Sequence, residues 1–115
     1  MKLSIIIPHH NGEDLLHNCL ESLLNNISIQ DFEIIVVDNG STDDSAEKAK
    51  ENFPSINLLK SEKNLGYSGG CNLGAKDSKG EYIIFLNNDT FHEKNWIEEL
   101  IKLSLIHISE PTRHV

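Results

Sequence analysis

The side chains best suited to chemistry in this 115-residue chain directly follow two apolar segments. Asn87, Asn88 and Asp89 come after the apolar residues 82–86, and Asp38 ends a second apolar segment. Open α/β sheets bind ligands at the carboxyl ends of their strands, and hard cations prefer oxygen ligands. The two clusters therefore predict a site for a nucleotide and a divalent metal, as in an enzyme that transfers a chemical group.

Asp89 and Asn87 are the candidate metal ligands of the later cluster. Mg2+ and Mn2+ take carboxylate oxygens together with phosphate oxygens of a substrate. Asp89 offers the carboxylate, and Asn87 offers an amide oxygen on the same side of an extended segment. The alternative is a strand-to-helix turn in which Asp89 or Thr90 caps a helix beginning near Glu93.

Asp38 has two interpretations that the residues alone leave open. A carboxylate at this strand end can accept hydrogen bonds from a base or a ribose at the mouth of the sheet. Asp38 can equally cap the following turn through Asn39–Ser41, because Asp and Asn favour turns by bonding their own backbone.

A glycine-rich segment, residues 64–74, contains backbone that can approach a ligand closely. A glycine-rich loop that opens a helix can present N–H groups to a phosphate. The segment lacks the lysine-containing pattern of a P-loop, and no dinucleotide fingerprint follows the first strand, which disfavours a nicotinamide site. The alternative is a loop over a helix that packs closely through small residues.

His9 and His10 follow Pro8 at the end of the first apolar segment. Adjacent residues of an extended segment point to opposite faces, so we do not expect the two imidazoles to share a metal. We expect at least one of them to line the pocket.

Strands and helices alternate along the chain. Short β-branched segments predict strands at 3–8, 32–37, 56–59 and 81–86. Apolar residues at helical spacing predict helices from an Asn11 cap to Leu24, over 43–52, over 68–75 and from about Trp96 to Leu103. The pattern predicts an α/β fold with a mostly parallel sheet and helices on both faces. The second strand lacks polar alternation after Glu33, so we expect both of its faces to be covered.

Composition narrows the classes of partner. The net charge of −8 argues against nucleic acid as a partner. No run of 18 apolar residues is present, and the start is too short for a signal peptide. Cys19 and Cys71 lie far apart, which predicts buried free thiols in a reducing, cytoplasmic setting. We assign one domain to residues 1–103 and interpret 104–115, which resemble translated adaptor sequence, as a non-native tail.

Four segments in order, 4–11, 33–43, 64–74 and 85–90, resemble the family 2 glycosyltransferases, and most of all their rhamnosyltransferase-like branch. The resemblance runs over residues 3–103. It implies a GT-A fold with a Rossmann-like sheet, truncated here to the N-terminal donor-binding part. It also implies inverting transfer of a sugar from a nucleotide-diphosphate sugar to an acceptor hydroxyl.

The resemblance assigns roles to individual residues. His10 stands where the family usually has Tyr, and Asn87 stands where the classical metal motif has its first Asp. Asp89 is then the last carboxylate of that motif and ligates Mg2+ or Mn2+ through the diphosphate. The implied nucleotide-sugar-binding residues are Pro8, His10, Asn11, Asp38, Asn64, Gly66 and Asn72. The general base of the family lies later in the chain than any residue here, so we expect this chain to bind donor weakly and to turn nothing over.

The resemblance also implies partners and a setting. The donor is a UDP- or dTDP-linked sugar, and the acceptor is a saccharide or is linked to a lipid. Family members commonly build cell-surface polysaccharide or O-antigen at the inner face of the cell membrane, which implies peripheral membrane association. A nucleotidyltransferase is disfavoured because Pro8–Gly12 contains no Lys or Arg. A non-catalytic nucleotide-binding or interaction module is the open alternative.

Overall fold

The computed structural model describes residues 3–27, 30–87 and 113–114, and strands alternate with helices along most of this part of the chain. Apolar β-branched segments form the strands, and amphipathic segments form the helices between them. The elements are β1 (Leu3–His9), α1 (Glu13–Asn26), β2 (Phe32–Asn39), α2 (Ser45–Asn52), β3 (Asn57–Ser61), α3 (Gly66–Asp77), β4 (Tyr82–Phe85) and β5 (Arg113–His114).

The described strands form one sheet in the order β3-β2-β1-β4-β5, and every pairing is parallel. β1 lies against β2 from the Leu3–Phe32 pair to the His9–Asp38 pair. Because parallel strands end at the same edge, β1, β2, β3 and β4 place their carboxyl ends together. The parallel α/β fold predicted from the alternating pattern is confirmed.

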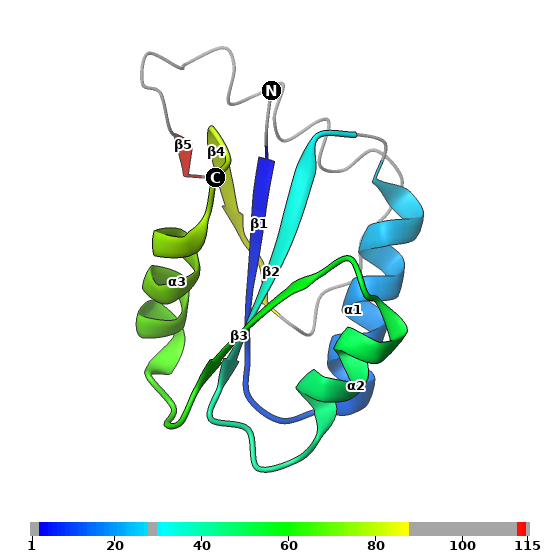
Figure 1. The fold of residues 1–115 in the computed structure, drawn as a ribbon, viewed down its shortest axis with the longest axis vertical. Helices are drawn as coiled ribbons and strands as arrows, with labels where there is room; N and C mark the ends of the chain where they lie inside the picture. Colours follow the sequence, from blue (N-terminus) through cyan, green and yellow to red (C-terminus); the bar gives the residue numbers. More distant parts are fainter. Residues whose placement is uncertain (1–2, 28–29, 88–112, 115) are drawn as a thin grey trace.

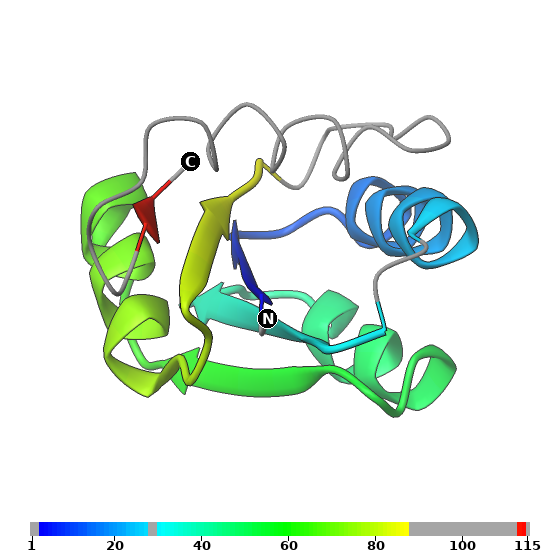
Figure 2. The same cartoon turned by 90° about the horizontal axis from the view of Figure 1, so that it is seen from above.

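The helices lie on both faces of the sheet, with α1 and α2 on one face and α3 on the other (Figures 1 and 2). Under α1 and α2 the core consists of apolar side chains from these helices and from the sheet. Its largest fully buried members are Leu3, Ile5, Ile7, Leu16, Leu20, Leu23, Ile34, Ile56 and Ile84. Residues 34–37 of β2 are all buried, which confirms that both faces of this strand are covered.

α3 packs closely on the second face because small residues face the sheet. A Cβ atom at Gly74 would lie 2.5 Å from Cγ2 of Ile6 and 3.1 Å from Cγ2 of Val37. Real Cβ atoms do not approach so closely, so a larger residue would push the helix away from the sheet. The glycine-rich segment therefore does form a helix that packs through small residues, the alternative considered from the sequence.

Several helix boundaries differ from the sequence-based prediction; α2, for example, begins at Ser45, two residues after the predicted start. α1 begins at Glu13 after Gly12, and the expected cap, Asn11, makes no capping bond to this helix. Its side chain bonds the backbone of the β2–α2 loop instead. α3 begins at Gly66, two residues before the predicted start, and Gly66 has a φ of 77°.

Several predictions concern residues outside the described part of the chain. These include the helix expected near Trp96, the turn at Thr90 and the placement of Asp89. In the tail, β5 pairs in parallel with Tyr82 and Ile83 of β4, and the non-native origin of 104–115 stays a prediction. Among the described residues, no helix is long and apolar enough to cross a membrane. Cys19 and Cys71 are free and buried, as predicted.

Candidate functional site at the carboxyl edge of the sheet

A hollow of about 200 Å3 opens at the carboxyl edge of the sheet, between the ends of β1 and β2 and the start of α3. We call it the edge hollow. It is lined by Pro8, His9, His10, Asn39, Asn64, Gly66 and Tyr67. Residues far apart in the sequence meet here because the sheet is parallel.

The edge hollow brings together four residues implicated by the sequence: Pro8, His10, Asn64 and Gly66. Asn11 and Asp38 lie next to it in the chain, in the polar network described below, and do not line it. Asn72 is exposed on α3 and is likewise absent from the lining. The nucleotide-binding roles of all these residues stay predictions.

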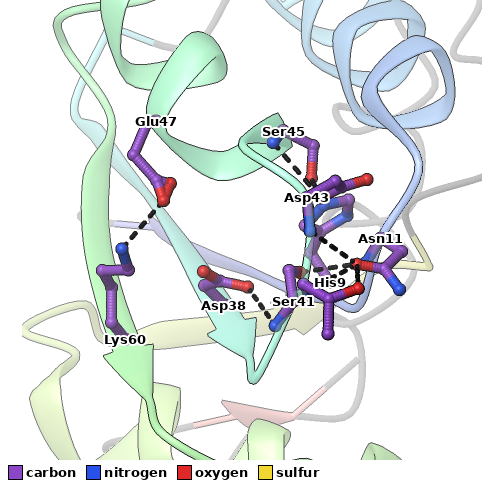
Figure 3. A network of polar contacts seen from close by, with 9 residues as sticks. His9, Asn11, Asp38, Ser41, Asp43, Ser45, Glu47 and Lys60 are labelled. Atoms are coloured by element: carbon purple, nitrogen blue, oxygen red, sulfur yellow. Dashed lines mark hydrogen bonds and ion pairs between the residues drawn. The ribbon is translucent and has the colours of Figure 1, made fainter.

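Asp38 is buried at the end of β2, with 3% of its surface exposed. Its Oδ1 accepts a hydrogen bond from the backbone N–H of Ser41 at 3.2 Å (Figure 3). The turn-capping interpretation of Asp38 is therefore observed. A carboxylate has about four acceptor positions, so this bond leaves capacity for a ligand N–H or O–H group.

His9 begins a chain of hydrogen bonds that ends at Asp43. Nε2 of His9 lies 2.7 Å from Oγ of Ser45, and the Ser45 hydroxyl donates to Oδ1 of Asp43. Because the single hydroxyl proton goes to the carboxylate, Oγ of Ser45 accepts from His9, which therefore carries its proton on Nε2. Burial lowers the pKa of His9 below its ordinary 6.5, against the opposing effect of the Asp38 and Asp43 charges.

Asp43 connects the two loops at the ends of β1 and β2. Its Oδ2 accepts from the backbone N–H of Gly12 at 2.9 Å, and its Oδ1 accepts from the backbone N–H of Ser45 at 3.2 Å. Hydrogen bonds from Ser45 and Gly12 stabilise the charged carboxylate and so lower the pKa of Asp43.

Asn11 completes this connection in a left-handed conformation, with a φ of 55°. Its Oδ1 accepts from the backbone N–H groups of Thr42 at 2.8 Å and Asp43 at 3.3 Å, and its own N–H donates to Oγ of Ser41 (Figure 3). Few non-glycine residues adopt a positive φ. We call the bonded residues 9, 11–12, 41–43 and 45 the loop clamp.

The opposite side of the edge hollow is organised by Asn39. Its side-chain Nδ2 donates to the Gly66 carbonyl at 2.9 Å, and its Oδ1 accepts from the Leu65 N–H at 3.2 Å. Its main-chain carbonyl lies 2.9 Å from Nδ1 of His10. A carbonyl only accepts, so His10 carries a proton on Nδ1 and leaves Nε2 for other partners.

Tyr67 adds an aromatic ring to the lining from the first turn of α3, with 52% of its surface exposed. Desolvation, together with a hydrogen bond to the Cys71 side chain one turn later, raises the pKa of the Tyr67 phenol. An exposed aromatic ring beside a hollow can stack on a planar ligand.

Of the two predicted metal ligands, Asn87 lies just after β4, and Asp89 is outside the described residues. Leu86 donates its N–H to the Ile6 carbonyl at 2.9 Å. This bond keeps the chain beside β1 for one residue beyond β4, and the exposed Asn87 follows. The thiol of Cys19 in α1 donates to the Asn87 carbonyl at 3.7 Å. An Asn87 amide and an Asp89 carboxylate are hard oxygen donors and so fit Mg2+ or Mn2+ in type. Within residues 3–27 and 30–87 no group of three His, Cys, Asp or Glu side chains could hold a metal.

A larger hollow, of about 420 Å3, lies near the amino ends of β2 and β3. It is lined by Glu33, Lys50, Asn57, Leu58, Leu59, Asp77 and Lys79. It shares no lining residue with the edge hollow and contains none of the residues predicted from the sequence. Ligands of parallel sheets bind at the carboxyl edge, so the smaller hollow is the better candidate despite its size.

Sequence reasoning missed Asn39, Asp43, Ser45 and Tyr67 as parts of this site. From the sequence, Asn39 is interpreted only as part of the turn after Asp38, although it is buried at the end of β2. The sequence assigns no site role to Asp43 or Ser45, and their link to His9 depends on the fold. The signal for Asn39 was available, because a polar residue buried at a strand end needs partners.

The comparisons with known proteins concern the family and the fold of the chain. Residues 4–105 match the model of the family described as glycosyl transferase family 2. The poly(ribitol-phosphate) beta-glucosyltransferase of Bacillus spizizenii is 40% identical over 96 residues, which cover 79% of this chain and 15% of that protein.

Solved structures of S. aureus TarS superpose on most of the chain. TarS 1-349 gives a TM-score of 0.79 at 28% identity, covering 93% of this chain and 33% of that one. TarS 1-349 in complex with UDP-GlcNAc gives a TM-score of 0.76 at 27% identity, covering 93% and 32%. The chain thus spans 15% of the length of the Bacillus spizizenii enzyme and about a third of the solved TarS chain.

Proposed function

Because the chain belongs to glycosyl transferase family 2, we propose that it forms the donor-binding part of a glycosyltransferase. The intact protein moves a sugar from a nucleotide-diphosphate sugar to an acceptor hydroxyl. The observation that carries the proposal is the edge hollow, which gathers Pro8, His10, Asn64 and Gly66 at the carboxyl edge of a parallel sheet. The similarity to a TarS structure in complex with UDP-GlcNAc supports a nucleotide-sugar ligand.

The nucleoside part of the donor occupies the edge hollow in this proposal. Pro8 and the exposed His10 offer an apolar and an aromatic surface for the base. Asp38 lies beside the hollow and would accept a hydrogen bond from a base N–H that reaches past the lining. The Asp38 carboxylate is already oriented by its bond to the Ser41 N–H. Preorganised polar groups lower the cost of binding because they need no reordering.

The diphosphate then extends along the same edge toward the end of β4. Asn87 and Asp89 would hold Mg2+ or Mn2+ there, and a bound cation would neutralise charge on the departing nucleoside diphosphate. The carbonyl of Asn87 is tied to the Cys19 thiol of α1. This contact orients the strand end from which the motif begins.

The stereochemistry of transfer, the product, the acceptor and the location are proposed from the sequence motifs and from the relatives. We propose inverting transfer in the synthesis of a cell-surface polysaccharide, with a saccharide or lipid-linked acceptor, at the inner face of the cell membrane. The similarity to a poly(ribitol-phosphate) beta-glucosyltransferase supports a surface polymer as the product class. The rhamnosyltransferase-like branch and a dTDP-linked donor stay predictions from the sequence motifs.

A titration of this chain with UDP and dTDP, followed by 15N NMR with and without Mg2+, tests the proposal. NMR detects the weak binding that a partial site gives. We expect one of the nucleotides to shift amide signals of residues 8–11, 38–41 and 64–67, with tighter binding in the presence of the metal. Asp38→Asn should weaken binding about ten- to a hundredfold, because one charged hydrogen bond contributes about 1.5–3 kcal/mol.

Asp31→Asn is the matched control, because Asp31 is exposed and precedes β2 at the opposite edge of the sheet. It makes the same change in charge and should leave the affinity unchanged. A folded chain that shows no shifts with either nucleotide would contradict the proposed donor site. Equal losses in both variants would contradict the role of Asp38.

A further inference from the structure

We propose that Asn39 is a positioning residue that builds both sides of the nucleotide pocket. The inference rests on the proposed function and extends it to a residue that acts on the ligand through the neighbouring residues that it holds in place. Asn39 ends β2 with 3% of its surface exposed. Its main-chain carbonyl bonds His10 in the loop after β1, and its side-chain amide bonds the backbone of Leu65 and Gly66 at the start of α3.

The side-chain amide of Asn39 pairs with the backbone of the β3–α3 loop. It donates from Nδ2 to the Gly66 carbonyl at 2.9 Å and accepts on Oδ1 from the Leu65 N–H at 3.2 Å. An N–H donor and a carbonyl acceptor side by side match a primary amide and no other short side chain. A carboxylate would keep the Leu65 bond and face the Gly66 carbonyl with a second acceptor.

The main-chain carbonyl of Asn39 fixes the other side of the pocket. It accepts from Nδ1 of His10 at 2.9 Å, which sets both the orientation and the tautomer of this exposed ring. His10 and Tyr67 both line the edge hollow, from the loop after β1 and from α3 respectively. The position of Asn39 therefore decides how far apart these two aromatic side chains lie.

Close packing keeps Asn39 in place. A Cβ atom at Gly70 of α3 would lie 2.8 Å from Nδ2 of Asn39 and 3.2 Å from Cβ of Pro8. The helix thus rests directly on the amide, and glycine is what permits the approach. Within the described residues, the hydrogen bonds that reach the backbone of 64–67 from outside this loop and its helix come from Asn39.

Two substitutions separate the two side-chain bonds. Asn39→Ala removes both, so we expect amide exchange of Leu65 to rise about tenfold in NMR measurements on the chain without ligand. Asn39→Asp keeps an acceptor for Leu65, so its amide should stay protected while the bond to Gly66 is lost. Both variants should lower UDP affinity about tenfold.

Ile56→Val is the matched control for stability. Ile56 is fully buried in the core beneath α1 and α2, directly before β3, and does not line the edge hollow. Removing one methyl group costs about 0.5–1.5 kcal/mol, in the range of one lost hydrogen bond. This variant should bind UDP like the wild type, which separates a loss of position from a general loss of stability.

The outcomes distinguish this inference from the proposed function. Unchanged Leu65 exchange in Asn39→Ala would overturn the inference whether or not UDP binds. Full UDP affinity in both Asn39 variants would also overturn it, and would leave the proposed donor site intact. A wild-type chain that binds no nucleotide, with faster Leu65 exchange in Asn39→Ala, would refute the donor site and confirm that Asn39 positions the loop.

Discussion

The two sides of the edge hollow are held in different ways. The loop clamp joins the ends of β1 and β2 through side chains and backbone groups of both loops, and its His9 and Ser45 are each 1% exposed. The β3–α3 loop and the first turn of α3 are open, with Leu65 42% and Tyr67 52% exposed, and Asn39 ties this segment to the sheet.

This difference indicates which part of the site is rigid and which part can adapt to a ligand. A network with several shared acceptors holds its geometry when one bond weakens, because the others remain. Among the described residues, the β3–α3 loop receives its hydrogen bonds from outside through Asn39, so its position is more sensitive to this one side chain. We therefore expect the loop clamp to contribute mainly to folding stability and the β3–α3 loop mainly to ligand binding.

The largest effect should come from Gly40, where the two regions meet. Gly40 has a φ of 72°, and a Cβ atom there would lie 2.8 Å from the backbone carbon of Lys63. Gly40→Ala should cost about 2–4 kcal/mol in urea unfolding, from the left-handed conformation and the clash together.

Gly66→Ala is the matched control, since Gly66 has a φ of 77° and nothing lies within 4 Å of its Cβ position. It should lose only the conformational part, about 1–2 kcal/mol. Equal losses at Gly40 and Gly66 would show that the close contact between the two regions has no energetic weight.

Ser45→Ala should have the next largest effect, because it breaks the chain of bonds inside the loop clamp. The buried His9 N–H loses its acceptor, and Asp43 loses a donor. An unsatisfied buried donor costs about 1–3 kcal/mol, measured as the change in free energy of unfolding. Ser55→Ala, at an exposed position before β3, should change stability by less than about 0.5 kcal/mol.

The pH dependence of stability should report His9. Its pKa is below 6.5 in the folded chain because the ring is buried, so the unfolded chain binds the proton more tightly. The contribution of His9 to the free energy of unfolding is therefore fully present above pH 6.5. It falls as the pH drops from 6.5 toward the folded pKa, by at most about 1.4 kcal/mol per pH unit.

His9→Gln tests that assignment, because glutamine still donates a hydrogen bond and does not titrate. The unfolding free energy of this variant should change less between pH 6.5 and 5 than that of the wild type. The pKa values of Asp43 and Glu47 are lowered from ordinary values of 3.8 and 4.5, so the stability that these carboxylates contribute is lost only at lower pH. An unchanged slope in His9→Gln would refute the assignment.

The smallest effect should come from the Glu47–Lys60 pair beside the loop clamp, at 2.8 Å (Figure 3). Both side chains are about half exposed, at 47% and 55%, so solvent and salt screen their attraction. Glu47→Gln should leave the melting temperature within the error of the measurement. A clear loss would mean that the surface pair belongs to the clamp.

Much of the fold could be predicted from the sequence because the spacing of apolar residues distinguishes strands from helices and the polar residues after them mark where strands end. The buried run at 34–37 required a covered parallel strand, and it is one. Asn11 was predicted as a helix cap from local propensity. The partners that it actually has, Thr42 and Asp43, are more than 30 residues away, and no local rule could find them.

The candidate site was predicted in part for the same reason. Pro8, His10, Asn64 and Gly66 meet at one edge because parallel strands end together. The hydrogen-bond chain from His9 to Asp43 and the position of Asn39 under α3 depend on tertiary contacts. The metal motif could be recognised from the sequence, and Asp89 lies outside the described residues.

The most direct test of the central claim is to locate the base of bound UDP by intermolecular NOEs from the uracil H5 and H6 protons. The edge hollow predicts NOEs to Pro8, His10 and Tyr67. NOEs to Leu58 or Lys79, which line the larger hollow, would contradict the assignment of the nucleotide site to the carboxyl edge of the sheet.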